Sequence, residues 1–248
     1  MISIGLTLPS FVEDPEPAIT VARAAEDAQL DGVFVFDHLW RGDAPSRRPA
    51  MECFTLLGAV AAETAHVKVG TLVARATLRP APALAHAFTT ADRISGGRLI
   101  AGIGAGDSQS RVENEAFGLP FGTMVDRVNA LHEAVWATRD NGFPVWVGGR
   151  AAQVREAVAI ADGWNEWGAD PESFARHAAL VRDVAPRATI TWGGLARPLE
   201  EGVAGLSTRL RAYLACGTEW LIVGPVDSRN PENVPVLAEV RARLRQQQ

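Results

Sequence analysis

The sequence predicts an α/β protein folded as one (β/α)8 TIM barrel. Eight short apolar runs of strand length alternate with segments of helical spacing, and this alternation is typical of such barrels. Most runs are continuously hydrophobic, as expected for parallel strands buried on both faces. A doubly wound open sheet gives the same alternation, but a count of eight favours the closed barrel. The predicted strands are Ile2–Leu8, Gly32–Asp37, Val67–Val73, Leu99–Ile103, Pro144–Val147, Gly163–Glu166, Ala188–Trp192 and Trp220–Val223.

The helical segments between these strands have recognisable ends. The segment from Pro82 to Ile94 stops at Gly96-Gly97, a common helix terminator. Three further segments begin with a capping side chain, either as a capping box or ahead of a first-turn proline. These are Thr123 with Asp126, Asp170-Pro171, and Asn230-Pro231. The longest irregular stretch runs from Ala105 to Gly122, and loops of that length are often functional.

Composition narrows the class of protein. The 248 residues are 47% hydrophobic and 21% charged, and they contain no low-complexity linker, so we expect one domain over residues 1–248. The net charge is -5 and no basic run exceeds Arg47-Arg48, which argues against nucleic-acid binding. Neither a bilayer-spanning run nor a charged amino-terminal leader is present, so we expect a cytoplasmic protein without membrane contact. The two cysteines and five histidines fit no metal motif.

The first candidate for chemistry is Asp37-His38 at the end of the second predicted strand. The carboxyl ends of barrel strands face the active site. An imidazole exchanges a proton near neutral pH, and a neighbouring carboxylate can fix its tautomer or bind a cofactor hydroxyl. The structural alternative is that Asp37 caps a turn and His38 is an ordinary loop residue.

Two glycine turns follow later strands. Gly104-Ala105-Gly106 would let the backbone approach a ligand closely, although Asp107 stands where a dinucleotide fingerprint needs its third glycine. Gly148-Gly149-Arg150 precedes a predicted helix, so backbone N–H groups and a cation would meet at a helix amino terminus. That arrangement predicts a phosphate or carboxylate site, and its alternative is a plain turn with a solvated arginine.

Tryptophans gather near the predicted strand ends. Trp40, Trp167 and Trp192 lie at or beyond the carboxyl ends of their strands and could wall an apolar pocket. For any single tryptophan, packing between helix and barrel is the simpler interpretation.

A combination of motifs resembles the luciferase-like monooxygenase family. Each motif is loose alone, but the run of SGGR, G-x-G-x-G and A-F-G-x-P-F is specific in combination. The match is strongest from Gly32 to Asn165. It comprises Val67–Val73, Ala83–Ile94, Ser95–Gly106 (SGGRLIAGIGAG) and Glu113–Phe121 (ENEAFGLPF), extended by Asp37-His38, Trp146–Gly149 and Ala161–Asn165.

The resemblance implies where a cofactor would lie. The family binds FMN or the deazaflavin coenzyme F420 at the carboxyl end of the barrel, often against a bulge with a non-proline cis peptide. The implied contacts are the strand-2 pair, the bulge, the strand-4 turn and the phosphate-binding turn. They correspond to Asp37 and His38; Leu72, Val73 and Ala74; Gly104, Ala105 and Gly106; and Gly148, Gly149 and Arg150. Glu113 matches an acidic residue of the family, with a structural role as the alternative to a functional one.

The resemblance also implies a homodimeric oxidoreductase acting on a small organic substrate. We expect hydride transfer with coenzyme F420, in which His38 is the acid or base and Asp37 orients it or binds the cofactor. An FMN-dependent monooxygenase is the alternative, and a catalytically silent flavin-binding protein is the alternative of another class. The segment Ala137–Phe143 is shorter than is common in the family, so the substrate cannot be inherited from relatives.

Overall fold

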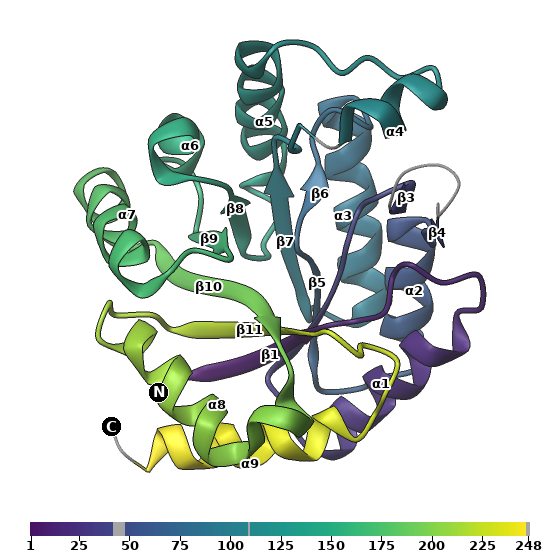
Figure 1. Ribbon diagram of the computed structural model, residues 1–248. Helices are drawn as coiled ribbons and strands as arrows, with labels where there is room; N and C mark the ends of the chain where they lie inside the picture. Colours follow the sequence, from purple (N-terminus) through teal and green to yellow (C-terminus); the bar gives the residue numbers. More distant parts are fainter. Residues whose placement is uncertain (42–47, 109, 247–248) are drawn as a thin grey trace.

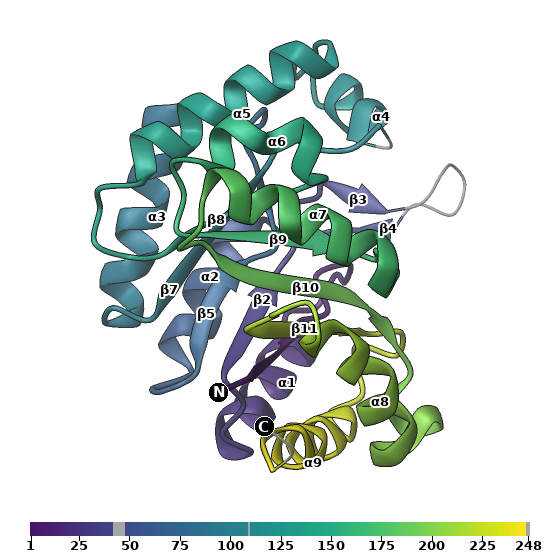
Figure 2. The same cartoon turned by 90° about the vertical axis from the view of Figure 1, so that its left-hand side faces the viewer.

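A computed structural model describes residues 1–41, 48–108 and 110–246. All eight predicted strands are present, and they form a closed parallel barrel (Figures 1 and 2). β5 pairs with both β2 and β7, and β1 pairs with β11, so the eight barrel strands close on themselves and the doubly wound alternative is wrong. The barrel strands are β1 (Ser3–Thr7), β2 (Gly32–Val35), β5 (Lys68–Thr71), β7 (Leu99–Gly104), β8 (Val145–Gly148), β9 (Gly163–Trp167), β10 (Thr189–Ala196) and β11 (Trp220–Pro225).

Three short strands are present in addition to the eight that the sequence predicts. β6 (Ala74–Arg75) follows β5 after a two-residue interruption and pairs with β7. β3 (Trp40–Arg41) and β4 (Arg48–Pro49) form a small antiparallel pair after β2. Insertions at this end of a barrel are positioned to shape a site.

The described helices surround the barrel (Figure 2). The glycine stop, the capping box and the Asp170 cap are confirmed: Gly96 has a φ of 67°, and Asp170 accepts the Ser173 N–H at 3.0 Å. The helices are α1 (Glu16–Asp27), α2 (Cys53–Ala62), α3 (Ala81–Ser95), α4 (Ser110–Ala116), α5 (Met124–Thr138), α6 (Ala151–Val158), α7 (Pro171–Val184), α8 (Pro198–Leu214) and α9 (Asn233–Arg245).

Two local predictions are wrong. Asn230 does not cap a helix that begins at Pro231; it accepts the Glu232 N–H within a turn, and α9 begins at Asn233. The stretch from Ala105 to Gly122 is not wholly irregular, because it contains α4.

The barrel interior is filled by aromatic rings and by glycines opposite them. Phe34 and Trp146 have centroids 5.8 Å apart, and Trp220 lies 5.4 Å from Trp146. A Cβ on Gly5 would lie 2.8 Å from the Phe34 ring, and one on Gly163 would lie 2.5 Å from the Trp146 ring. The interior is therefore a packed core, and the carboxyl ends of the strands are where barrels of this kind carry their active sites.

Trp192 belongs to the outer layer and does not line the mouth. It is 3% exposed, stacks on Tyr213 of α8 with centroids 4.2 Å apart, and donates its Nε1–H to the Ala169 carbonyl. For this residue, the packing interpretation is the correct one.

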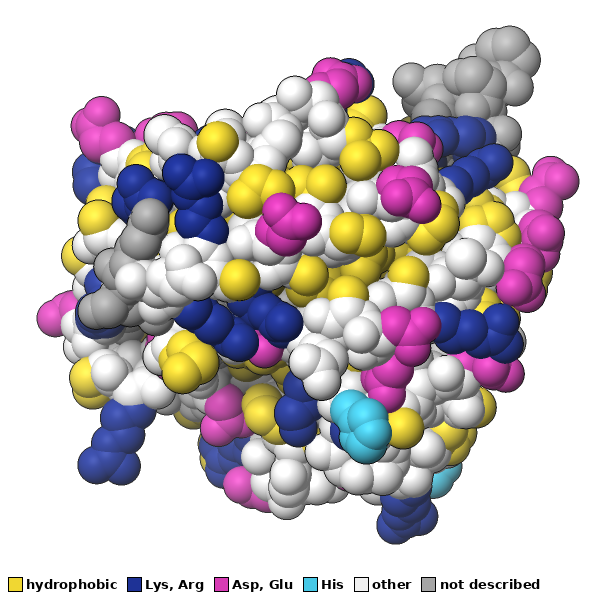
Figure 3. Space-filling model, turned by 90° about the horizontal axis from the view of Figure 1, so that it is seen from below, with side chains coloured by type: hydrophobic (Ala, Val, Ile, Leu, Met, Phe, Trp, Pro, Cys, Tyr) yellow, Lys and Arg dark blue, Asp and Glu magenta, His cyan; other side chains and the backbone are white. Residues whose placement is uncertain are grey.

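The outer surface carries side chains of mixed type. On the face seen in Figure 3, Lys and Arg side chains lie in several small groups, with Asp and Glu side chains between them and hydrophobic side chains across the middle. Within residues 1–41, 48–108 and 110–246, no helix is long and apolar enough to cross a membrane. The same residues contain no cluster suited to hold a metal ion.

Candidate functional site

The residues predicted from sequence follow different strands but converge on one end of the barrel. His38 follows β2, Val73 lies between β5 and β6, Gly106 follows β7, and Arg150 follows β8. Since the carboxyl ends of parallel barrel strands all meet at the same opening, these residues surround one mouth.

His38 is bound by a carboxylate from α4. Its Nδ1 lies 2.7 Å from Oε1 of Glu113, although 75 positions separate the two residues in the chain. The other oxygen, Oε2, accepts the Leu39 N–H at 2.8 Å and an Arg75 Nη2–H at 3.2 Å. The Glu113 side chain is 6% exposed and that of His38 is 27% exposed, so the carboxylate is enclosed while the imidazole reaches the surface of the mouth.

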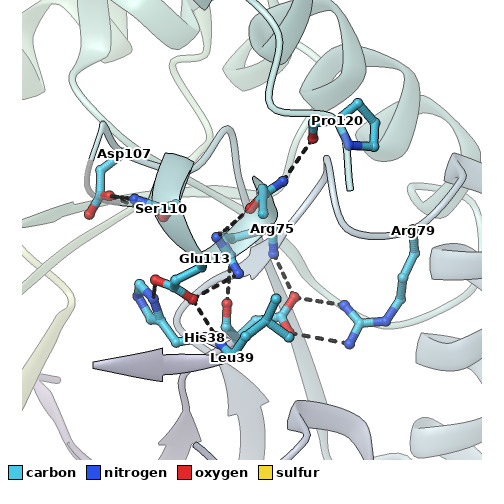
Figure 4. A network of polar contacts seen from close by, with 10 residues as sticks. His38, Leu39, Arg75, Arg79, Asp107, Ser110, Glu113 and Pro120 are labelled. Atoms are coloured by element: carbon cyan, nitrogen blue, oxygen red, sulfur yellow. Dashed lines mark hydrogen bonds and ion pairs between the residues drawn. The ribbon is translucent and has the colours of Figure 1, made fainter. Parts of the chain in front are cut away.

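The polar contacts of Asp37 are with two arginines, Arg75 and Arg79. It is 2% exposed, and its carboxylate accepts from Arg79 at 2.7 and 3.2 Å and from the Arg75 backbone N–H at 2.9 Å. Its carbonyl accepts the Arg75 Nε–H at 2.7 Å. Figure 4 shows the resulting network, with His38 at one end, Arg79 at the other, and Glu113 and Arg75 between them. The carboxylate that binds the imidazole is thus that of Glu113.

For two groups of this network, Glu113 and Arg79, hydrogen bonds and ion pairs outweigh the effect of burial on the pKa. Burial alone would raise the pKa of Glu113, but hydrogen bonds from His38 and the Leu39 N–H, with the nearby Arg75 charge, lower it below its usual value. Burial alone would lower the pKa of Arg79, but its hydrogen bonds and ion pairs with Asp37 and Glu52 raise it. Glu113 is therefore a carboxylate at neutral pH.

The interruption between β5 and β6 places Val73 at the mouth. The peptide bond between Leu72 and Val73 is cis, at the position where the resemblance implies a bulge. A Cβ on Gly148 would lie 2.5 Å from Cγ1 of Val73, and one on Gly104 would overlap Cγ2. The first glycine of each turn therefore has a packing reason, because it leaves room for the Val73 side chain.

The turn before α6 is fixed by backbone contacts. Gly149 has a φ of 142°, donates its N–H to the Asn165 carbonyl at 3.0 Å, and accepts the Trp164 Nε1–H at 2.8 Å. Arg150 follows it at the N-cap of α6; it is exposed and has no ion-pair partner among the described residues. First-turn N–H groups lack acceptors within a helix, so this turn has the donors that an anion requires.

One side of the mouth is an aromatic wall, which we define as Trp167, Phe36 and Phe11. Trp167 lies edge-on to Phe36 at 5.7 Å, Phe36 stacks on Phe11 at 5.9 Å, and Phe11 lies 5.5 Å from the His38 ring. Trp167 remains 39% exposed. Of this wall, the sequence pattern singles out Trp167 as a candidate; Phe11 belongs to no motif.

Two arginines of the site were also missed. Arg75 and Arg79 hold Asp37, and Arg75 also holds Glu113. The sequence shows that two arginines closely follow a predicted strand. It does not show which acidic side chains they contact, so their role could not be predicted. The remaining predicted residues, Leu72, Ala74 and Ala105, are at most 9% exposed and belong to the hydrophobic core clusters.

Comparison with known proteins identifies relatives. A family model described as luciferase-like monooxygenase matches residues 3–199. An F420-dependent glucose-6-phosphate dehydrogenase of Beutenbergia cavernae is 35% identical over 171 residues, which are 64% of this chain and 47% of the relative. The corresponding protein of Nakamurella multipartita is 35% identical over 184 residues, 60% of this chain and 51% of the relative. The chain thus spans about half the length of these curated relatives.

Solved structures share the fold. An F420-dependent secondary alcohol dehydrogenase in complex with an F420-acetone adduct superimposes with a TM-score of 0.84 at 14% identity, covering 98% of this chain and 99% of that one. A type II Baeyer-Villiger monooxygenase of Pseudomonas putida in complex with FMN gives 0.73 at 11% identity, covering 96% of each chain. At such identities the likeness confirms the barrel fold and no more.

Proposed function

The chain belongs to the luciferase-like monooxygenase family, and from that premise we propose that it is a coenzyme F420-dependent oxidoreductase acting on a small organic substrate. The observation that carries the proposal is the pairing of an imidazole with an anion site at one barrel mouth. His38 has no partner for Nε2 among the described residues, and the N–H groups of α6 with Arg150 lie around the same opening. The names of the curated relatives support the choice of F420.

The residues present fit such a cofactor. A deazaflavin carries a phosphate and a flat ring. The donors before α6 suit the phosphate, since Arg150 is a charged donor and the helix amino terminus is electropositive. Val73 and the aromatic wall present apolar surface on which a ring could lie. When bound, reduced coenzyme F420 would supply a hydride.

The chain's own residues then have distinct tasks. If the substrate is an alcohol, Nε2 of His38 would accept the hydroxyl proton as the carbon that bears the oxygen gives up its hydride. In the reverse direction the protonated ring would return that proton to the oxygen as the carbon receives the hydride. Trp167 closes the barrel interior, because its ring lies over Gly193 and Gly224. The aromatic wall favours weakly polar substrates over sugar phosphates, so we do not extend the glucose-6-phosphate of the relatives to this chain.

Titration with oxidised and reduced coenzyme F420 tests the cofactor. Binding should occur in the micromolar range, and Arg150→Ala should weaken it by roughly ten- to a hundredfold, since a charge-assisted hydrogen bond contributes about 1.5–3 kcal/mol. Arg155→Ala is the matched control, because Arg155 lies later on the same helix and pairs with Asp183. Absence of binding at tens of micromolar, with FMN binding instead, would refute the proposal.

An FMN-dependent monooxygenase is the second candidate, because a structural neighbour is solved with FMN. Flavin retained through purification, together with oxygen consumption, would favour it. Binding without turnover on a broad substrate panel would favour a silent binding protein, and His38→Ala separates the cases by keeping binding while removing turnover.

A further inference from the structure

The contacts of Glu113 fix which of its oxygens can meet His38. Oε2 receives two donors, the Leu39 N–H and Nη2 of Arg75, and Oε1 faces Nδ1 of His38. The carboxylate cannot turn away without leaving these donors unpaired at a site that is 6% exposed.

Arg75 is itself held in place. Its Nη1 donates to the Asn114 side-chain oxygen at 3.0 Å, and its Nε donates to the Asp37 carbonyl at 2.7 Å. The Asn114 amide in turn donates to the Pro120 carbonyl at 2.8 Å, which orients it. The Arg75 side chain is 3% exposed, so its Nη2 group cannot turn into solvent and stays beside Oε2 of Glu113.

We propose that Glu113 is a positioning residue: it keeps the proton of neutral His38 on Nδ1 and leaves the Nε2 lone pair available at the mouth. A carboxylate can only accept, so the ring nitrogen facing it must donate. This inference rests on the proposed function, in which Nε2 acts on the substrate. Its direct consequence, the tautomer of His38, is a property of the protein without cofactor.

The isosteric variant Glu113→Gln should invert the tautomer. The Leu39 N–H and Arg75 both need an oxygen at the Oε2 position, so the glutamine carbonyl is drawn there. Its NH2 group then faces His38, where it makes Nδ1 an acceptor and moves the proton to Nε2. In this state Nε2 can donate but cannot accept, so His38 can no longer serve as a base.

Nitrogen-15 NMR of histidine-labelled protein above the imidazole titration range reads the tautomer directly. His38 signals are identified as those lost in His38→Gln. The wild type should carry the Nδ1–H form and Glu113→Gln the Nε2–H form. Glu52→Gln is the matched control, because Glu52 meets Arg79 at the far end of the same network, and it should leave the His38 signals unchanged.

Turnover supplies the second readout. In Glu113→Gln, kcat should fall roughly a hundredfold, as expected when general acid–base catalysis is lost, while KM changes less than about threefold. A wild-type His38 with its proton on Nε2 would overturn the inference, and so would a variant that keeps the wild-type tautomer. If Glu113→Gln does not fold, the wild-type spectrum alone decides. Failure of the F420 titration beside a correct tautomer would refute the proposed function and leave this inference standing.

Discussion

Replacing Gly148 with alanine should destabilise the protein through one identifiable contact. The added Cβ would lie 2.5 Å from Cγ1 and 3.4 Å from Cγ2 of Val73. Contacts this close force a neighbour to shift, and overpacking of this kind costs about 1–3 kcal/mol. For a chain of 248 residues, such a loss corresponds to a melting temperature lower by about 2–12 °C.

Urea unfolding provides the assay, since a changed midpoint at constant slope reports a changed free energy of unfolding. Gly58→Ala is the control: nothing lies within 4 Å of a Cβ built there, and Gly58 is inside α2. That variant should be stabilised by about 0.5–1 kcal/mol, because alanine is the better helix former.

A double-mutant cycle with Val73→Ala tests the cause. If the clash with Val73 is the reason, Gly148→Ala should cost little in the Val73→Ala background, giving a coupling energy of about 1–3 kcal/mol. An equal cost in both backgrounds would refute the reasoning, because Val73 would then not be the group displaced.

Two further predictions concern stability away from the mouth. Arg98 donates to the carbonyls of Ala61, Thr64 and Val67. Because Arg98→Met would leave these carbonyls unpaired, it should lower the free energy of unfolding, measured in urea, by about 3 kcal/mol. The control Arg187→Met, at an exposed position, should change it by less than about 0.5 kcal/mol. Burial alone would raise the pKa of Glu26, but the backbone N–H groups of residues 65–67 lower it. Its stabilisation is therefore complete above the unfolded pKa near 4.3 and is lost as the pH falls through the lower folded value. Glu26→Gln should thus be less stable than wild type at pH 7, and the difference should narrow at about pH 3; an unchanged difference would contradict this.

Local patterns in the sequence were sufficient to predict the barrel fold. Most strands are continuous apolar runs, and such runs are expected where a strand is buried on both faces, here between the barrel interior and the helices. The Thr123–Asp126 box succeeded because its partners are three residues apart. Asn230-Pro231 has a comparable local pattern, but the turn uses the Asn230 side chain before α9 begins. A cap pattern specifies a bend in the chain and leaves open whether a helix or a turn comes after it.

The candidate site could be predicted only where its residues follow strands. His38 and Arg150 were found in this way, because the ends of barrel strands meet at one mouth. The partner of His38 was not found, because Glu113 lies 75 residues away in a stretch predicted to be irregular. The adjacent Asp37 was the nearer carboxylate in sequence, yet its oxygens bind Arg79 and the Arg75 backbone. Proximity in the chain is therefore a poor guide to which carboxylate meets the imidazole, because Asp37 and His38 lie beyond the end of β2 and contact different elements.

The side chains inside the barrel limit where a ligand can lie. Phe34, Trp146 and Trp220 fill the barrel floor, and Leu72 and Ile222 pack on the same cluster. Trp167 reaches across Gly193 and Gly224 at the top. If the proposed function is right, a ring of flavin size would lie outside this packed core, and Val73 and the aromatic wall are the surface that we propose for it. Specificity would then come from residues beyond the strand ends, so substitutions in the floor should alter stability, and substitutions at the wall should alter the choice of substrate.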